Sequence, residues 1–328
     1  MRSIWGASLL LSSLLAGVVA QDDWRTKVKV QRNGFYPLDV VDKLEEATMT
    51  KVEAYMAKKI AAGKNNGCTL ENAGYMNYDR YTKDAKNSAL FNGNATSMGG
   101  NGEPDPRYTG LRMGSATIKS AGGGGCVTQG PFKEFVVQNQ PVEKSVQVIN
   151  FLNSYMATVG PGSPVMNNVP KNPVAGGGGY NPRCMRRDVN SEVALGATAE
   201  KSYNLITLSK DINTFYNTLL TPPVNRSDPY NWGIHNSGHY ISGGDPGGDP
   251  MVSPGDPIFY FHHAMLDRLW WIWQMQDPDT RVNAQVTLGG ASTSRKIDLK
   301  WLIGDVIPVL EAHDGLGGHG GAFCHVYV

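Results

Sequence analysis

The chain has 328 residues, of which 41% are hydrophobic, so it is long enough to bury a sizeable core in one or two domains. Its 30 basic and 29 acidic residues leave a formal net charge of +1. This balance creates no field of a single sign, and it gives no support for nucleic acid or an anionic membrane as a partner.

The N-terminus has the three parts of a secretory signal peptide. Arg2 precedes an apolar stretch, residues 4–20, which ends in a small residue at Ala20. We expect cleavage after Ala20, so that residues 21–328 form one secreted domain. A membrane anchor is the alternative, but the stretch is short for a span and no basic cluster follows it directly.

An even number of cysteines fits two disulfides in a secreted protein, although three pairings are possible and the sequence does not choose among them. The cysteines are Cys68, Cys126, Cys184 and Cys324. None stands in a CxxC pair, so we do not predict a thiolate metal site. Two sequons, at Asn94 and Asn225, fit a glycoprotein.

Regular structure is predicted to be mainly helical, with long irregular loops. Residues 36–63 have apolar residues near helical spacing, acidic residues early and lysines late, which predicts a helix. A second helix is predicted over residues 198–220. Residues 64–196 carry two runs of four glycines and many Asn and Pro, so we expect loops with a few short strands, such as 135–137.

All seven histidines lie in the last third of the chain: His235, His239, His262, His263, His313, His319 and His325. His235 and His239 are four apart, so on a helix both imidazoles can reach one ion. Neutral imidazole suits Zn, Cu, Fe and Ni. A zinc protease would place its general base, Glu, directly after the first histidine, where this chain has Asn236.

A third helix, residues 257–276, carries the adjacent pair His262 and His263. Asp256 suits the N-cap of this helix and Pro257 its first turn. The segment is too apolar to face water, and a buried histidine needs a hydrogen-bond partner or a metal. A satisfied core histidine explains one such residue, whereas four histidines on two helices favour a metal centre.

The segments "HNSGHYISGG" and "DPIFYFHHAMLDRLWWIWQ" together resemble the CuB half of the tyrosinase and catechol oxidase family of type-3 copper proteins. Residues 77–106, 130–135 and 181–189 are similar to its short secreted fungal branch. The resemblance covers most of the chain after about Cys68. It implies a helix-bundle copper site in a secreted oxidoreductase. Such an enzyme oxidises phenols, catechols or aminophenols to quinones with O2, in some members as a monooxygenase.

The resemblance also implies a set of copper ligands within residues 231–276. His235, His239 and His263 match the positions that bind copper in the CuB site. Adjacent residues on a helix point about 100° apart, so His262 is expected to pack behind the ligands rather than bind the ion.

Further roles follow from the same resemblance. Asn236 is expected to hold a water or to orient a phenol proton, as a catalytic residue. Asp267 is expected to orient an imidazole or to pair with Arg268. Three other residues are candidates for lining the substrate approach, although ordinary packing explains them better: Phe259, Met251 and Val252.

The chain departs from the family pattern in one respect. The family holds two coppers with three histidines each, and the CuA set comes first, but no histidine precedes His235. Near residues 72–77 the sequence passes directly from the stretch before CuA to the stretch after it. We therefore expect an incomplete helix bundle. His313, His319 and His325 are spaced by six in a Gly-rich tail, which we predict to be solvated rather than to hold a second copper.

Three functions remain as hypotheses. The first is a secreted copper oxidase of small phenolic substrates and O2. The second, favoured by the missing histidines, is a non-catalytic protein with a single copper site. The third, a mononuclear zinc hydrolase, lacks a placed Glu base. The sequence predicts no membrane partner after signal cleavage and does not indicate the oligomeric state.

Overall fold

The structure is a computed structural model, and it describes residues 40–64, 67–68, 71–77, 80–81, 83–113, 116–138, 168–170, 180–221, 232–249, 252–286, 295–298 and 306–327. The predicted signal peptide, the sequon at Asn225, and Met251 lie outside these residues. The chain divides into two compact units. One unit contains the residues up to Tyr75, Tyr203–Tyr216 and Asp267 onwards, and the other contains Met76–Ser202 and Asn217–Leu266.

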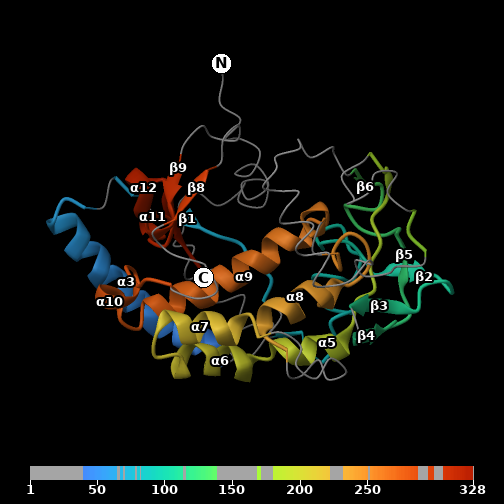
Figure 1. The fold of residues 1–328 in the computed structure, drawn as a ribbon, viewed down its shortest axis with the longest axis horizontal. Helices are drawn as coiled ribbons and strands as arrows, with labels where there is room; N and C mark the ends of the chain where they lie inside the picture. Colours follow the sequence, from blue (N-terminus) through green and yellow to red (C-terminus); the bar gives the residue numbers. More distant parts are fainter. Residues whose placement is uncertain are drawn as a thin grey trace, which may run out of the picture. The chain divides into compact units, whose positions relative to one another are not determined.

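The first unit combines helices with a small mixed sheet (Figure 1). Strand β11 pairs in parallel with β1 and antiparallel with β10, and a separate ladder joins β8 to β9. Its elements are α3 (Val40–Ala61), β1 (Glu71–Asn72), α10 (Pro278–Arg281), β8 (Lys296–Asp298), β9 (Val306–Pro308), α11 (Val309–Ala312), β10 (Leu316–Gly317), α12 (Gly318–Gly321) and β11 (Phe323–Val326).

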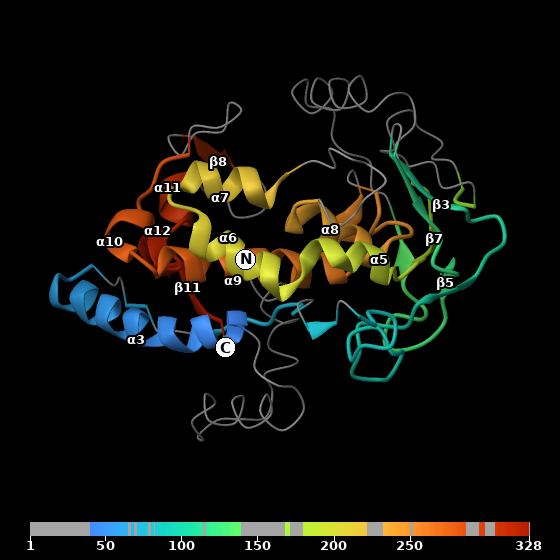
Figure 2. The same ribbon diagram turned by 90° about the horizontal axis from the view of Figure 1, so that it is seen from below.

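The second unit consists of short antiparallel ladders and helices, in which α5 lies beside α8 (Figure 2) and η2 also packs against α8. Its elements are β2 (Gly102–Pro104), β3 (Gly110–Met113), β4 (Ala116–Lys119), β5 (Gly124–Val127), β6 (Val136–Val137), β7 (Arg183–Cys184), α5 (Ser191–Ala194), η2 (Leu195–Ala197), α8 (Ile234–Ser242) and η4 (Ser253–Gly255). The ladders pair β2 with β5, β3 with β4, and β6 with β7.

Helix α9 (Ile258–Gln274) corresponds to the segment predicted as helix over residues 257–276. The boundary between the two units falls within it, between Leu266 and Asp267. Its second half supplies the aromatic core of the first unit, where Trp270 stacks on Trp273 at 5.0 Å and Phe215 contacts both rings. Helices therefore dominate the regular structure, as the sequence predicts.

The single helix predicted over residues 198–220 is wrong, because this segment forms α6 (Ala199–Leu208) and α7 (Ile212–Leu219). The break follows from local hydrogen bonding. The Asp211 carboxylate accepts from the backbone N–H and the hydroxyl of Thr214, each at 2.9 Å, which starts a new helix. The carbonyl of Ser209 accepts instead from the indole N–H of Trp273 at 2.8 Å.

The structure selects one of the three possible disulfide pairings. Cys68 is bonded to Cys324, and Cys126 is bonded to Cys184. The first bond ties β11 to the segment that precedes β1, and the second ties β5 to β7. No helix among the described residues is long and apolar enough to span a membrane.

A buried ion pair holds the start of α9. The guanidinium of Arg187 donates to both carboxylate oxygens of Asp256 at 2.8 and 2.6 Å, and both side chains are 0% exposed. Asp256 also accepts from the N–H of Ile258 at 3.0 Å, as an N-cap residue does. The ion pair therefore positions the helix that carries His262 and His263.

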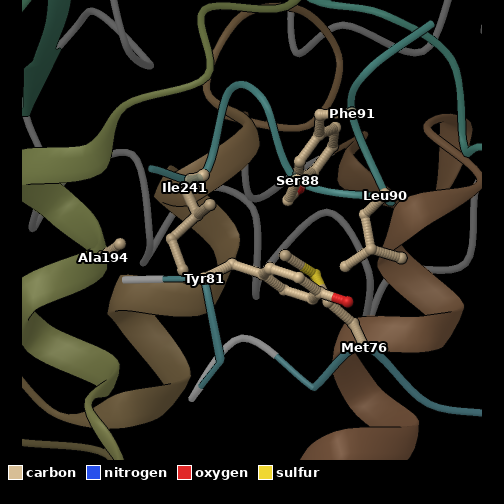
Figure 3. A pocket seen from close by; sticks show the side chains of 8 residues that line it. Met76, Tyr81, Ser88, Leu90, Phe91, Ala194 and Ile241 are labelled. Atoms are coloured by element: carbon tan, nitrogen blue, oxygen red, sulfur yellow. The ribbon is translucent and has the colours of Figure 1, made fainter. Parts of the chain in front are cut away.

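A small apolar pocket lies elsewhere in the second unit. Figure 3 shows the ring of Tyr81 among the other side chains that line it, which are Met76, Ala85, Ser88, Leu90, Phe91, Ala194 and Ile241. None of these residues is a histidine, so this pocket is separate from the predicted metal centre.

Candidate metal centre

Helix α8 presents two imidazoles on one face, as the spacing of four residues predicts. His235 and His239 are half-buried, and their Nε2 atoms lie 3.2 Å apart. The helix is held by a buried apolar face, in which Trp232 and Tyr240 pack edge to face at 5.8 Å. The side-chain amide of Asn236 donates to the carbonyl of Thr221 at 3.0 Å, and the side chain also interacts with His235.

The first half of α9 supplies the third imidazole. The Nε2 atom of His263 lies 3.2 Å from that of His239. Three nitrogens that each stand about 2.0–2.1 Å from one ion, at tetrahedral angles, are about 3.3 Å from one another. The Nε2 atom of His239 therefore lies at about this spacing from the Nε2 atoms of both His235 and His263, and the donor atoms of the cluster all lie within 4.8 Å of one another.

The surroundings keep these imidazoles neutral. Burial, followed by the charge of His263, lowers the pKa of His235 to about 4. Burial, followed by the charges of His235 and His263, lowers the pKa of His239 to about 3. Burial also lowers the pKa of His263. At neutral pH the nitrogen lone pairs are available to a metal, and the cluster contains no carboxylate, which suits copper or another imidazole-binding ion.

His262 belongs to the same cluster but lies deeper than the other three. The four histidines each offer a donor atom, and these atoms all lie within 4.8 Å of one another. His262 is 1% exposed, and its ring packs edge to face on His239 at 4.6 Å. The ring of Phe259 packs against the ring of His263, with the two ring centroids 4.2 Å apart.

Asp267 contacts the C-terminal strand. The Nε2 atom of His325 lies 3.0 Å from Oδ2 of Asp267, and the hydroxyl of Tyr327 donates to the same oxygen at 2.5 Å. Arg268, the other partner considered for Asp267, pairs with Glu45 inside the first unit. The sequence analysis predicted His325 to be solvated in the tail and did not consider Tyr327, although a spacing of two at the end of an extended strand places both on one face.

The other tail histidines do not form a second centre. His313 packs on Trp270 at 5.3 Å, and Nδ1 of His319 lies 2.9 Å from a carboxylate oxygen of Glu311. The seven histidines of the chain all lie in the described ranges, and in those ranges only the four-histidine cluster groups three or more potential ligands.

The helical fold and its cluster of imidazole donors define a class of helical proteins with a candidate metal centre, and comparisons with known proteins give the family. Residues 46–276 match the model of the common central domain of tyrosinase. The chain belongs to the tyrosinase family.

Two curated relatives and one solved structure illustrate the similarity. Tyrosinase P from Aspergillus terreus is 33% identical over 218 residues, which cover 63% of this chain and 52% of that protein. An N-acetyl-6-hydroxytryptophan oxidase from Emericella nidulans is 32% identical over 162 residues, covering 48% and 37%. A polyphenol oxidase variant from Thermothelomyces thermophila has a TM-score of 0.60 at 25% identity, covering 92% and 76%. The chain thus spans about half the length of Tyrosinase P.

The neutral state of the imidazoles predicts a pH dependence. In an unfolded chain the imidazoles titrate near pH 6.5. In the folded chain the pKa of His235 is about 4 and that of His239 about 3, so both stay neutral to lower pH. Below pH 6.5 protons therefore bind preferentially to the unfolded chain. The stability of the metal-free protein should be fully present above about pH 6.5 and should fall as the pH drops toward 4.

Copper occupancy should fall in the same direction, because protons compete with the metal for the same nitrogens. Denaturant titrations of the metal-free protein, and copper analysis after dialysis at a series of pH values, measure the two effects. A copper content that stays flat down to about pH 4 would contradict this prediction.

Proposed function

We propose that this chain is a copper protein of the tyrosinase family that holds one copper ion through the Nε2 atoms of His235, His239 and His263. The observation that carries the proposal is that the Nε2 atom of His239 lies 3.2 Å from the Nε2 atoms of both His235 and His263. When bound, copper supplies a redox centre that can exchange electrons with O2 and with a phenolic substrate. The protein supplies three imidazoles, two from α8 and one from α9, and the packing of the two helices already brings these side chains together.

The sequence on either side of the expected CuA position supports a single copper. Ala73 donates its N–H to the carbonyl of Val326 at 2.9 Å, beside β11 in the first unit. Met76 donates its N–H to the carbonyl of Phe261 on α9, also at 2.9 Å, in the second unit. The residues between Ala73 and Met76 therefore leave no room in the chain for a further set of ligands.

Two residues receive roles under this proposal. Asn236 is half-buried and its side chain interacts with His235, which supports its role in holding a water or orienting a phenol proton at the centre. Asp267 interacts with His325 and Tyr327, which supports a role in fixing β11 to α9. The role of Asp267 requires no contact with the substrate.

Coupled oxidation of phenols, catechols or aminophenols to quinones with O2 is the second candidate function. Membership of the tyrosinase family favours it, as do the names of the relatives, which include a tyrosinase and an oxidase of a hydroxylated tryptophan. It requires a second copper.

We also propose that the protein is secreted, and its two disulfides support this location.

Copper analysis of the purified protein separates the two functions. We expect about one copper per chain, with the electron paramagnetic resonance signal of an isolated Cu(II) ion bound by nitrogen, and no quinone formed from a monophenol, a catechol or an aminophenol. Two coppers per chain together with quinone formation would establish the second candidate instead. A protein that takes up no copper when Cu(II) is supplied would contradict both.

A further inference from the structure

Gly238 of α8 faces the buried imidazole of His262 on α9. It stands one residue before His239 and three after His235. A Cβ atom on residue 238 would lie 2.1 Å from Cε1 and 2.2 Å from Nδ1 of His262, which is far inside van der Waals contact. Glycine is therefore the residue that lets the imidazole of His262 rest against the backbone of α8.

The ring of His262 meets α8 at two further points. It packs edge to face on the ring of His239 at 4.6 Å and lies tilted at 5.9 Å from the ring of His235. Its side chain also interacts with the backbone of His235. One imidazole from α9 thus touches both copper-binding residues of α8 and the glycine between them.

The contact between His262 and Gly238 bears on the distance between the Nε2 atoms of His239 and His263, on which metal binding depends. His263 follows His262 directly on α9, and its Nε2 atom has to reach within 3.2 Å of the Nε2 atom of His239 on α8. Ligand distances tolerate a change of only about 0.2 Å. A small change in the separation of α8 from the first half of α9 would therefore move one donor away from the other two.

We propose that Gly238 and His262 form a positioning pair, in which the imidazole of His262 acts as a spacer against Gly238 and sets the helix separation at which His235, His239 and His263 converge. This inference rests on the copper site of the proposed function. In this role His262 shapes the site through packing and is not itself a ligand.

A double-mutant cycle with Gly238→Ala and His262→Ala tests the pair. The added methyl group of Gly238→Ala overlaps the ring of His262, so we expect Cu(II) affinity to fall about 10–100-fold, the range typical of residues that orient ligands. We expect His262→Ala to weaken binding about 10-fold, with the nitrogen hyperfine pattern of three imidazoles retained. In the double variant the new methyl group occupies space that the ring has vacated, so affinity should recover to near that of His262→Ala.

Ser237→Ala is the matched control on the same helix. Ser237 is also fully buried, and its hydroxyl has no hydrogen-bond partner among the described residues. Its replacement should leave Cu(II) affinity and the metal-free unfolding free energy unchanged.

Several results would overturn the inference. One is a Cu(II) affinity of Gly238→Ala equal to that of the wild type. Another is a strictly additive loss of Cu(II) affinity in the double variant. A third is the loss of one nitrogen from the hyperfine pattern of His262→Ala, which would make His262 a ligand. If the wild-type protein binds no copper, the proposed function fails, and the same cycle is read from the unfolding free energies of the metal-free proteins. Non-additive free energies would then support the spacer contact, and additive ones would reject it.

Discussion

Alanine in place of His263 is expected to abolish stoichiometric copper binding. His263 is the donor that α9 contributes, and its Nε2 atom lies 3.2 Å from that of His239. Without it, His235 and His239 leave a site of two imidazoles on one helix. Replacing an outer residue that only orients a ligand lowers metal affinity by about 10–100-fold. Loss of a ligand itself should therefore weaken Cu(II) binding by more than about 100-fold. Competition titration against a chelator of known affinity measures the change.

His319→Ala provides the matched control for this variant. His319 is partly exposed, lies on α12 and contacts the carboxylate of Glu311 at 2.9 Å, so its loss should leave copper affinity unchanged. Full copper content in His263→Ala would show that the set of three ligands is wrong. Equal losses in the two variants would point to non-specific binding of copper by surface histidines.

Alanine in place of Asp256 is expected to lower the unfolding free energy by about 3–5 kcal/mol, the cost of breaking a buried ion pair by removing one partner. The carboxylate forms two hydrogen bonds with Arg187, and both side chains are 0% exposed. Its removal leaves a buried guanidinium without its counter-charge. It also removes the cap on the N–H of Ile258, where α9 begins. Urea denaturation of the metal-free protein at neutral pH measures the loss.

Lys58→Ala tests an exposed ion pair. The side chains of Lys58 and Asp279 are 64% and 63% exposed, and Nζ of Lys58 lies 2.6 Å from Oδ1 of Asp279. Exposed pairs contribute about 0–1 kcal/mol, so this variant should be nearly as stable as the wild type. If Asp256→Ala costs no more than Lys58→Ala, the buried ion pair does not hold the start of α9, and another contact has to do so.

The sequence by itself was sufficient for the local features of the site. A spacing of four places His235 and His239 on one helix face, and an apolar segment with a capping Asp256 predicts the helix that carries His263. These features depend on backbone periodicity and on contacts between near neighbours, which a short stretch of sequence contains. The absence of any histidine before His235 is also visible without a structure.

The tertiary structure alone decided the features that depend on residues far apart in the chain. It paired Cys68 with Cys324, across a separation of 256 residues, and it placed the indole N–H of Trp273 on the carbonyl of Ser209 at the break in the helix predicted over 198–220. It placed His325 and Tyr327 on Asp267 instead of leaving them in a solvated tail. It also brought His262 against Gly238, although nothing near either residue in the sequence indicates the other. Such contacts arise only when the elements pack, because packing depends on the shapes of side chains from many segments at once.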